Sequence, residues 1–327
     1  MAQNTNWRHL HGSAFDGRPV LVTGGAGFIG SHLVAALDEL EAKITVLDDL
    51  SAGGNPKSLP RGVEFVHGSI LDESALQKCS AGREFVFHQA ALGSVPQSME
   101  EPVRFQLVNS TGTLNVLEAA RKAKVHRVMF AASSSAYGDS ATLPKIESMP
   151  TAARSPYAAT KVAAEALLGA YSAGMGIDTV SLRYFNIFGP RQRADSAYAA
   201  VIAAFAKALL AGKRPTIFGD GEQSRDFTYV ENAVQANLLA ARRSERLEGA
   251  VINVACGIRV TVNELASRMA KWLNREDLKP NYLAERAGDV KHSQADIGLA
   301  RRMLGYEPIV DFATGLDATM KWYRDGI

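Results

Sequence analysis

Three glycines, Gly24, Gly27 and Gly30, follow an apolar run at Pro19–Val22 and open a stretch with helical apolar periodicity. Because glycine lacks a Cβ atom, such positions allow a tight turn and let backbone N–H groups approach a pyrophosphate at a helix N-terminus. A strand, a glycine turn and a helix in this order are typical of a dinucleotide-binding fold. The same glycines could also make only a tight turn, so the interpretation needs support from other residues.

Asp48 gives that support. It ends the second apolar run, Ile44–Leu47, eighteen residues after Gly30. A carboxylate at this place can accept hydrogen bonds from an adenosine ribose and would repel a 2′-phosphate. We therefore expect NAD as the cofactor, whereas the neighbouring Asp49 is interpreted as a solvated loop carboxylate.

Apolar runs and helical patterns alternate along most of the chain, which predicts an α/β fold with a Rossmann-type, doubly wound parallel sheet. The expected strands are Pro19–Val22, Ile44–Leu47, Glu64–Val66, Phe85–His88, Arg127–Ala132, Thr179–Tyr184, a strand-turn at Thr216–Gly221, and Val251–Val254. The expected helices are one from Ile29 to Leu40, Glu73–Lys78, Asn109–Lys122, one from Ser155–Pro156, Tyr198–Ala211, Val230–Arg242, Val262–Leu273 and Asp296–Leu304.

The alternation loosens after residue 186, which divides the expected fold into two domains. Residues 18–188, together with about 226–257, are expected to form the NAD-binding Rossmann domain. Residues 189–225 and 258–327 are expected to form a smaller α/β substrate-binding domain.

Residues 1–17 are polar and mixed, and we expect them to be an N-terminal extension without the apolar core of a signal peptide. His9 and His11 lie in this extension. Since no carboxylate or cysteine cluster accompanies them, they are interpreted as tail residues, and no metal site is expected.

Charge and cysteine content exclude several classes of partner. The 36 basic and 34 acidic residues interleave and give a net charge of +2, so nucleic acid is not an expected partner. The most apolar stretch, residues 197–212, is too short to span a bilayer, and no membrane partner is expected. Cys79 and Cys256 have no CxxC spacing. A reducing, cytoplasmic location is therefore expected.

Tyr157 and Lys161 stand four residues apart on an expected helix, so their side chains emerge on one face. A tyrosine has a pKa of about 10, and an adjacent ammonium is expected to lower it by roughly 1–3 units. Tyr157 is thus a candidate general base, and Ser133, at a strand end, can position a substrate oxygen. In many helices such a pair is only a tyrosine ring at the edge of the core and a solvated lysine. Its position in the chain after the glycine loop and Asp48 favours the catalytic interpretation.

Six strings together carry a resemblance to a known family. They are TGGAGFIG (Thr23–Gly30), HQAA (His88–Ala91), SSSAYGD (Ser133–Asp139), SPYAATK (Ser155–Lys161), RYFNIFGPRQ (Arg183–Gln192) and SRDFTYV (Ser224–Val230). From about residue 19 onward, the chain resembles the extended short-chain dehydrogenases, the NAD-dependent epimerase/dehydratase family that acts on nucleotide sugars. The resemblance implies a catalytic set of Ser133, Tyr157 and Lys161.

The same resemblance implies two groups of binding residues. Those along NAD, beyond the glycines and Asp48, are Phe28, Ile29, Ser69, Ile70, Ala90, Ala91, Leu92 and Asn109, with Tyr157 and Lys161. Those for a UDP-sugar are Ser134, Ser135, Asn186, Arg225, Arg286, Asp289 and Ser293. Guanidinium groups suit phosphates and a carboxylate suits ribose hydroxyls, although each arginine could instead form a surface ion pair. Ser69 departs from the family, which often has an aspartate there, so its adenine contact is expected to be weaker.

Ser134 and Ser135 separate the possible reactions. Dehydratases and decarboxylases that resemble this strand end carry acidic residues there, and hydroxyl groups cannot replace those acids in proton transfer. The resemblance therefore implies a 4-epimerase with tightly bound NAD, which oxidises the sugar at C4 to a transient 4-keto intermediate and reduces it on the opposite face.

Ser293 indicates which sugar the site accepts. Together with AALGSVPQS (Ala90–Ser98) and RAGDVKHSQAD (Arg286–Asp296), it looks most like UDP-N-acetylglucosamine 4-epimerases, whereas enzymes restricted to unacetylated sugars resemble this segment but carry a bulky aromatic there. A UDP-glucose/UDP-galactose or UDP-glucuronate 4-epimerase is the alternative, and a non-catalytic NAD-binding module a further one. The resemblance also implies a homodimer formed through two helices per subunit, Asn109–Lys122 and the helix of Tyr157.

Overall fold

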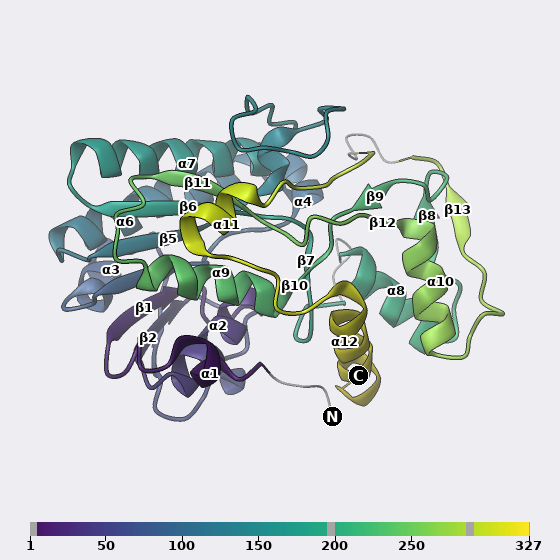
Figure 1. The fold of residues 1–327 in the computed structure, drawn as a ribbon, viewed down its shortest axis with the longest axis horizontal. Helices are drawn as coiled ribbons and strands as arrows, with labels where there is room; N and C mark the ends of the chain where they lie inside the picture. Colours follow the sequence, from purple (N-terminus) through teal and green to yellow (C-terminus); the bar gives the residue numbers. More distant parts are fainter. Residues whose placement is uncertain (1–4, 195–199, 286–290, 327) are drawn as a thin grey trace.

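A seven-stranded parallel sheet forms the centre of the computed structural model, which describes residues 5–194, 200–285 and 291–326 (Figure 1). The strand order is β11-β6-β5-β4-β1-β2-β3, and every neighbouring pair is parallel. The strands are β1 (Pro19–Thr23), β2 (Lys43–Asp48), β3 (Glu64–His67), β4 (Phe85–His88), β5 (Arg127–Ser133), β6 (Asp178–Tyr184) and β11 (Ala250–Val254). The expected doubly wound α/β fold is confirmed.

Helices cover both faces of this sheet because successive strand residues point to opposite sides. On β1, Val20 and Val22 join one apolar cluster, and Leu21 joins another. The first cluster contains α2 (Phe28–Glu39), α9 (Val230–Arg242) and α11 (Gly298–Leu304), and the second contains α3 (Glu73–Ser80), α6 (Gly112–Lys122) and α7 (Pro156–Gly174).

Arg127 and Asp178, the first residues of β5 and β6, form a buried ion pair in which the two residues are also register partners. The Arg127 guanidinium donates as well to the carbonyls of Ala240 at 2.6 Å, Arg243 at 2.9 Å and Glu245 at 2.7 Å. These bonds reach the last turn of α9 and the residues that follow it, so one side chain joins two central strands and the end of a covering helix.

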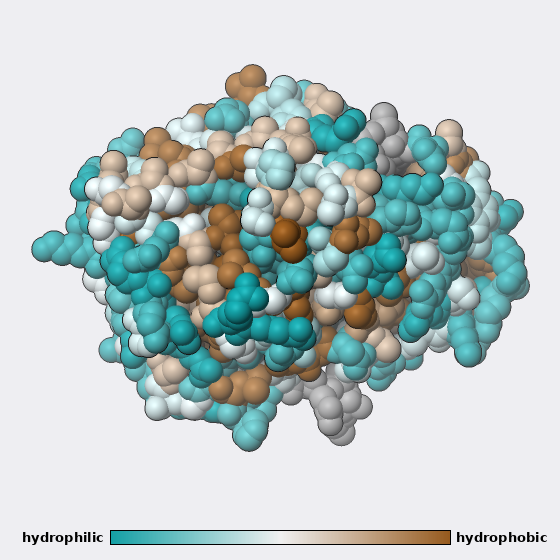
Figure 2. All heavy atoms as spheres, turned by 45° about the horizontal axis from the view of Figure 1, so that its top comes forward, coloured by the Kyte–Doolittle hydropathy of each residue, from teal (hydrophilic) through white to brown (hydrophobic). Residues whose placement is uncertain are grey.

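A smaller lobe lies beside the sheet, at the right of Figure 1, and has its own apolar cluster. It contains α8 (Val201–Leu210), α10 (Val262–Trp272), α12 (Phe312–Gly326) and the parallel pair β8 (Thr216–Phe218) and β13 (Asn281–Leu283). Two short pairs lie next to it: β7 (Ile187–Phe188) with β10 (Thr228–Tyr229), and β9 (Ser224–Arg225) with β12 (Val260–Thr261). On the face shown in Figure 2, hydrophilic side chains cover most of the right-hand part of the molecule.

The helix expected over Asn109–Lys122 differs from the observed one. Residues 106–111 form a π-helical turn, preceded by the short helices α4 (Val95–Glu100) and α5 (Pro102–Phe105), and α6 follows. The Thr113 hydroxyl donates to the Asn109 carbonyl at 2.6 Å and competes for an acceptor of the regular helix. The helix α12 was not expected from the sequence either.

The N-terminal extension is not a loose tail, because α1 (Trp7–His11) packs against the sheet domain. Trp7 and Phe15 are buried in the cluster beside α2. The interpretation of His11 as a tail residue is therefore wrong: it is 4% exposed, and its Nε2 lies 2.8 Å from Gln235 Oε1 on α9.

Acid should loosen this extension. Burial lowers the pKa of His11 to about 4 from 6.5, although its bond to Gln235 acts in the opposite direction. Between these two values the unfolded chain binds more protons than the folded one, so stability falls as the pH drops from about 6.5 towards 4. At pH 5 the loss due to His11 is on the order of 1–2 kcal/mol relative to pH 7.5.

Urea unfolding of the wild type and of His11→Gln at pH 7.5 and pH 5 measures this difference. His32 and His88 titrate in both proteins, so the comparison isolates His11. We expect the variant to lose less stability on acidification. An equal loss in the two proteins would contradict the role of His11.

Candidate active site

The glycine loop between β1 and α2 has no room for side chains at two positions. A Cβ atom on Gly24, which has a φ of +70°, would lie 2.5 Å from the Ala90 nitrogen, and one on Gly30 would lie 2.1 Å from the Gly24 oxygen. Gly27 caps α2 without a side-chain hydrogen bond. The N-terminus of α2 therefore presents backbone N–H groups across a closely packed loop, which suits a pyrophosphate.

Asp48 at the end of β2 holds this loop. One carboxylate oxygen accepts the Ala26 N–H at 2.9 Å, and the other accepts the Leu50 N–H at 2.8 Å. Burial raises the pKa of Asp48, while these two bonds lower it. The carboxylate thus lies at the strand end expected from the sequence and has a structural role in the glycine loop.

A pocket of about 1300 Å³ runs along the carboxyl ends of the parallel strands. It brings together most of the predicted residues from distant parts of the sequence: Gly24, Gly27, Phe28, Ile29, Gly30, Asp48, Ile70, Ala90, Ala91, Leu92, Ser133, Ser134, Ser135, Tyr157, Lys161, Asn186, Arg225 and Ser293. Arg286 and Asp289 lie outside the described residues.

Two predicted cofactor residues, Ser69 and Asn109, do not line this pocket. Asn109 is buried, and its amide group binds Leu92 through both backbone groups, accepting the N–H at 2.9 Å and donating to the carbonyl at 3.1 Å. It also donates to the Thr160 hydroxyl at 3.1 Å. Asn109 therefore fixes the loop after β4 against α7. The Ser69 hydroxyl accepts the Leu71 N–H at 3.3 Å, beside the pocket-lining Ile70.

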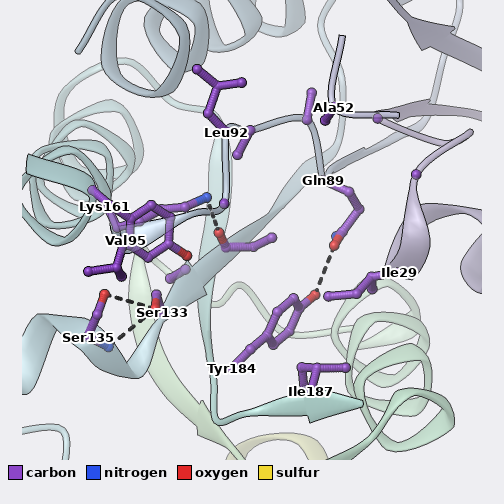
Figure 3. A pocket seen from close by; sticks show the side chains of 18 of the residues that line it. Ile29, Ala52, Gln89, Leu92, Val95, Ser133, Ser135, Lys161, Tyr184 and Ile187 are labelled. Atoms are coloured by element: carbon purple, nitrogen blue, oxygen red, sulfur yellow. Dashed lines mark hydrogen bonds between the residues drawn. The ribbon is translucent and has the colours of Figure 1, made fainter. Parts of the chain in front are cut away.

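Tyr157, Lys161 and Ser133 meet where β5 ends and α7 begins. Figure 3 labels Lys161 and Ser133 at this place. Ser155 caps α7 by accepting the Ala158 N–H at 3.2 Å, which sets Tyr157 on the first turn. The buried Lys161 Nζ donates to the Ala131 carbonyl at 2.7 Å and lies 6.0 Å from the centre of the Tyr157 ring.

The expected lowering of the Tyr157 pKa by Lys161 is not found. Burial raises the pKa of Tyr157, and a hydrogen bond with Ser133 lowers it only in part. Burial also lowers the pKa of Lys161 to about 7. The apolar surroundings therefore disfavour both charged forms, and the pair is not an activated base by itself.

Ser133 accepts two hydrogen bonds from Ser135, from its N–H at 3.2 Å and from its hydroxyl at 2.9 Å. Ser134 and Ser135 form the turn after β5 and line the pocket. This end of the pocket therefore presents hydroxyl groups. The additional proton transfers of a dehydratase or decarboxylase would require acidic side chains at this strand end.

Sequence reasoning missed a closed triangle of hydrogen bonds, buried or partly buried, beside the glycine loop. The Tyr184 hydroxyl donates to Gln89 Oε1 at 3.3 Å, Gln89 Nε2 donates to Asn237 Oδ1 at 3.2 Å, and Asn237 Nδ2 donates to the Tyr184 oxygen at 2.6 Å (Figure 3 shows the first of these). Gln89 directly follows β4, and Tyr184 is the last residue of β6. Both are polar residues at the pocket-facing ends of strands, within the strings HQAA and RYFNIFGPRQ, and this position is the sequence signal that could have identified them.

A second hollow of about 270 Å³ opens beside the first and shares four lining residues with it, Asn186, Ile187, Gln192 and Arg225. Asn186 has a φ of 39° and donates from Nδ2 to the Asp226 carbonyl at 3.3 Å. Arg225 donates to the Lys291 carbonyl at 3.1 Å. The two hollows thus meet at an amide and a guanidinium.

The described part of the chain holds no group of three or more His, Cys, Asp or Glu side chains placed to bind a metal ion. In the same residues, no helix is both long and apolar enough to cross a bilayer.

Gly30→Ala should abolish NAD binding, because its methyl group would overlap the Gly24 carbonyl that shapes the loop. Gly174→Ala, at the end of α7, is the matched control, since a Cβ atom there meets nothing within 4 Å. The measurement is the NAD content of each purified protein, together with its dissociation constant after reloading. Equal NAD retention in both variants would contradict the prediction that the glycine loop has no room for a side chain at position 30.

Comparison with known proteins agrees with this geometry. The model of the NAD dependent epimerase/dehydratase family matches residues 20–255. The UDP-glucose 4-epimerase of Mycolicibacterium smegmatis is 37% identical over 311 residues, which cover 93% of this chain and 98% of that protein.

Two solved structures are similar over nearly the whole chain. A UDP-N-acetylglucosamine 4-epimerase from Methanobrevibacter ruminantium, in complex with UDP-N-acetylmuramic acid, has a TM-score of 0.90 and 40% identity, covering 95% of this chain and 100% of that one. A UDP-glucose 4-epimerase from Thermus thermophilus, in complex with NAD, has a TM-score of 0.87 and 33% identity, covering 94% and 100%. The chain belongs to the NAD-dependent epimerase/dehydratase family and uses NAD as its cofactor.

Proposed function

We propose that the chain is a UDP-N-acetylglucosamine 4-epimerase, which interconverts UDP-GlcNAc and UDP-GalNAc through a transient 4-keto sugar. The coarser assignment, an NAD-dependent UDP-sugar 4-epimerase and hence an isomerase, follows from the family and the relatives named above. The observation that carries the finer proposal is Ser293, a half-buried small side chain that lines the same pocket as Ser133 and Tyr157. Its size leaves space for an N-acetyl group.

Tyr157 is the proposed acceptor of the C4 hydroxyl proton, with Ser133 holding the substrate oxygen. When bound, NAD supplies reversible acceptance of a hydride and, in its oxidised form, a positive charge. Because burial raises the pKa of Tyr157, positive charge nearby is needed to stabilise the phenolate. A protonated Lys161 supplies such a charge from this chain, held by the Ala131 carbonyl at 2.7 Å.

The nucleotide diphosphate is proposed to bind where the two hollows meet. Arg225 and Asn186 line both hollows, and a guanidinium and an amide suit phosphate oxygens. Arg286 and Asp289 are proposed to complete this clamp. The clamp must hold while the 4-keto sugar turns over, so its groups belong on the nucleotide rather than on the hexose.

Unacetylated UDP-sugars are the second candidate. A pocket with Ser293 has space for glucose and galactose as well as for their N-acetylated forms, and the relative from M. smegmatis is a UDP-glucose 4-epimerase. UDP-glucuronate is a further candidate of the same class. A non-catalytic module is disfavoured because the Tyr157–Lys161 pair lies complete in the pocket.

The two lobes are proposed to bind different ligands. Residues 18–188, with about 226–257, would hold NAD, and residues 189–225 and 258–327 would hold the sugar nucleotide. The separate apolar cluster of α8, α10 and α12 supports this division, whereas α11, which lies within 258–327, packs in the cluster of the sheet domain. Free Cys79 and Cys256 are consistent with a reducing, cytoplasmic location.

A homodimer is also proposed, formed through the helices around residue 109 and α7. Val103 and Leu107 are 80% and 48% exposed, and α7 exposes a row of alanines: Ala159, Ala163, Ala166 and Ala170. Sedimentation velocity should give the mass of two chains.

The decisive experiment incubates the purified protein, without added NAD, with UDP-GlcNAc, UDP-glucose or UDP-glucuronate, and follows C4 inversion. We expect UDP-GlcNAc to be inverted with the highest kcat/KM. A clear preference for an unacetylated substrate would move the assignment to the second candidate, and inversion of none would refute it.

Tyr157→Phe should lower kcat by roughly 100-fold or more, because it removes the proton acceptor while keeping the ring. NAD content and UDP binding should stay at wild-type levels. Tyr171→Phe is the matched control, since it removes a phenol from the same helix, one whose hydroxyl donates to Glu118 at 2.7 Å. Near-normal turnover by Tyr157→Phe would rule out its role as the base.

Ser293→Tyr should lower kcat/KM for UDP-GlcNAc by roughly tenfold or more while sparing UDP-glucose, because the ring fills the space of the N-acetyl group. Ser293→Ala, which keeps that space open, is the control and should retain both activities. The ratio of the two kcat/KM values is the measurement. Equal losses on both substrates would overturn the volume argument.

A further inference from the structure

Asp226 is a buried carboxylate that lines neither hollow but binds segments that lead to both. It follows β9 and is fully shielded from solvent. Its Oδ1 accepts the Cys256 N–H at 3.0 Å, and its Oδ2 accepts the N–H groups of Gly257 at 3.0 Å and Ala295 at 3.1 Å. Two oxygens thus join two separate segments to the residue after β9.

Three backbone N–H groups offset part of the cost of burying the Asp226 carboxylate, whose pKa burial raises to about 7. In the ranges that the structure describes, no Lys, Arg or His forms an ion pair with it. A buried carboxylate without a counter-ion is costly unless N–H groups satisfy it, and an uncharged side chain would fill the same space at lower cost. What a carboxylate provides here, and an uncharged side chain would not, is two oxygens that accept hydrogen bonds from several directions at once.

The bonded segments carry substrate-lining residues. Ala295 lies two residues after Ser293, whose N–H donates to the Ser224 carbonyl at 3.0 Å. Arg225 directly precedes Asp226, and the Asp226 carbonyl accepts the Asn186 side chain at 3.3 Å. One residue thus connects the groups proposed for the diphosphate to the group proposed for the hexose.

We propose that Asp226 is a positioning residue of the sugar-nucleotide site. It fixes the segment of Ser293 against the strand of Arg225, and so sets the separation between the hexose-binding and diphosphate-binding groups. This inference rests on the roles proposed above for those two residues.

Asp226→Asn, in the full chain with bound NAD, tests it. The amide replaces one acceptor oxygen with an NH₂ group that faces backbone donors. We expect KM for UDP-GlcNAc to rise roughly tenfold or more with a smaller change in kcat, because the misplaced groups weaken binding. The dissociation constant of UDP, measured by calorimetry, should rise with it, and the NAD content should not change.

Asp311→Asn is the control. Asp311 also accepts a backbone N–H, that of Thr314 at 2.9 Å, but it lies before α12 and lines neither hollow. Only Asp226→Asn should raise KM at a temperature where both variants are folded.

Wild-type KM and UDP affinity in folded Asp226→Asn would overturn the inference. If that variant is recovered only unfolded, Gln294→Ala takes its place, because Gln294 Nε2 bonds to the Gly257 carbonyl at 2.9 Å across the same junction. A raised KM with unchanged NAD content then supports the inference, and an unchanged KM overturns it. If the wild type inverts no UDP-sugar, the proposed function fails, and UDP affinity still decides the role of Asp226.

Discussion

The ion pair of Arg127 and Asp178 fixes the arrangement on which the rest of the molecule depends. These residues are register partners at the amino ends of β5 and β6, and the same register pairs Ser133 with Tyr184 at the carboxyl ends. Because side chains alternate along a strand, a slip of one residue would move each of them to the other face of the sheet. A buried ion pair adds little stability but penalises other registers strongly, since any of them would leave a charge unpaired.

Close backbone packing then brings the glycine loop to the same edge. Gly24 lies so near Ala90 that the loops after β1 and β4 touch, and Asn109 holds the second loop against α7 through Leu92 and Thr160. The helix of Tyr157 and Lys161 is thereby placed against the cofactor pocket by hydrogen bonds from a residue that does not line it. Distances in the site therefore depend on contacts behind its surface.

The electrostatics of the pocket have a consequence for the chemistry. Burial raises the pKa of Tyr157 and lowers that of Lys161 to about 7, so the protein alone keeps the proton on the phenol. Positive charge beside Tyr157 would favour its phenolate form. The proton transfer proposed for Tyr157 would therefore depend on such a charge, which a protonated Lys161 or oxidised NAD would supply.

The sequence determined the alternating order of strands and helices, the glycine turn and the strand-end position of Asp48, because these follow from local spacing and apolar periodicity. Tertiary structure decided the rest. The docking of His11 onto Gln235, the π-helical turn around Asn109 and the triangle of Gln89, Tyr184 and Asn237 depend on partners far away in the chain. The pKa of Tyr157 follows burial rather than helical spacing, because desolvation is set by everything that surrounds a group. The spacing of Tyr157 and Lys161 along one helix predicts only that their side chains share a face, and not how deeply they are buried.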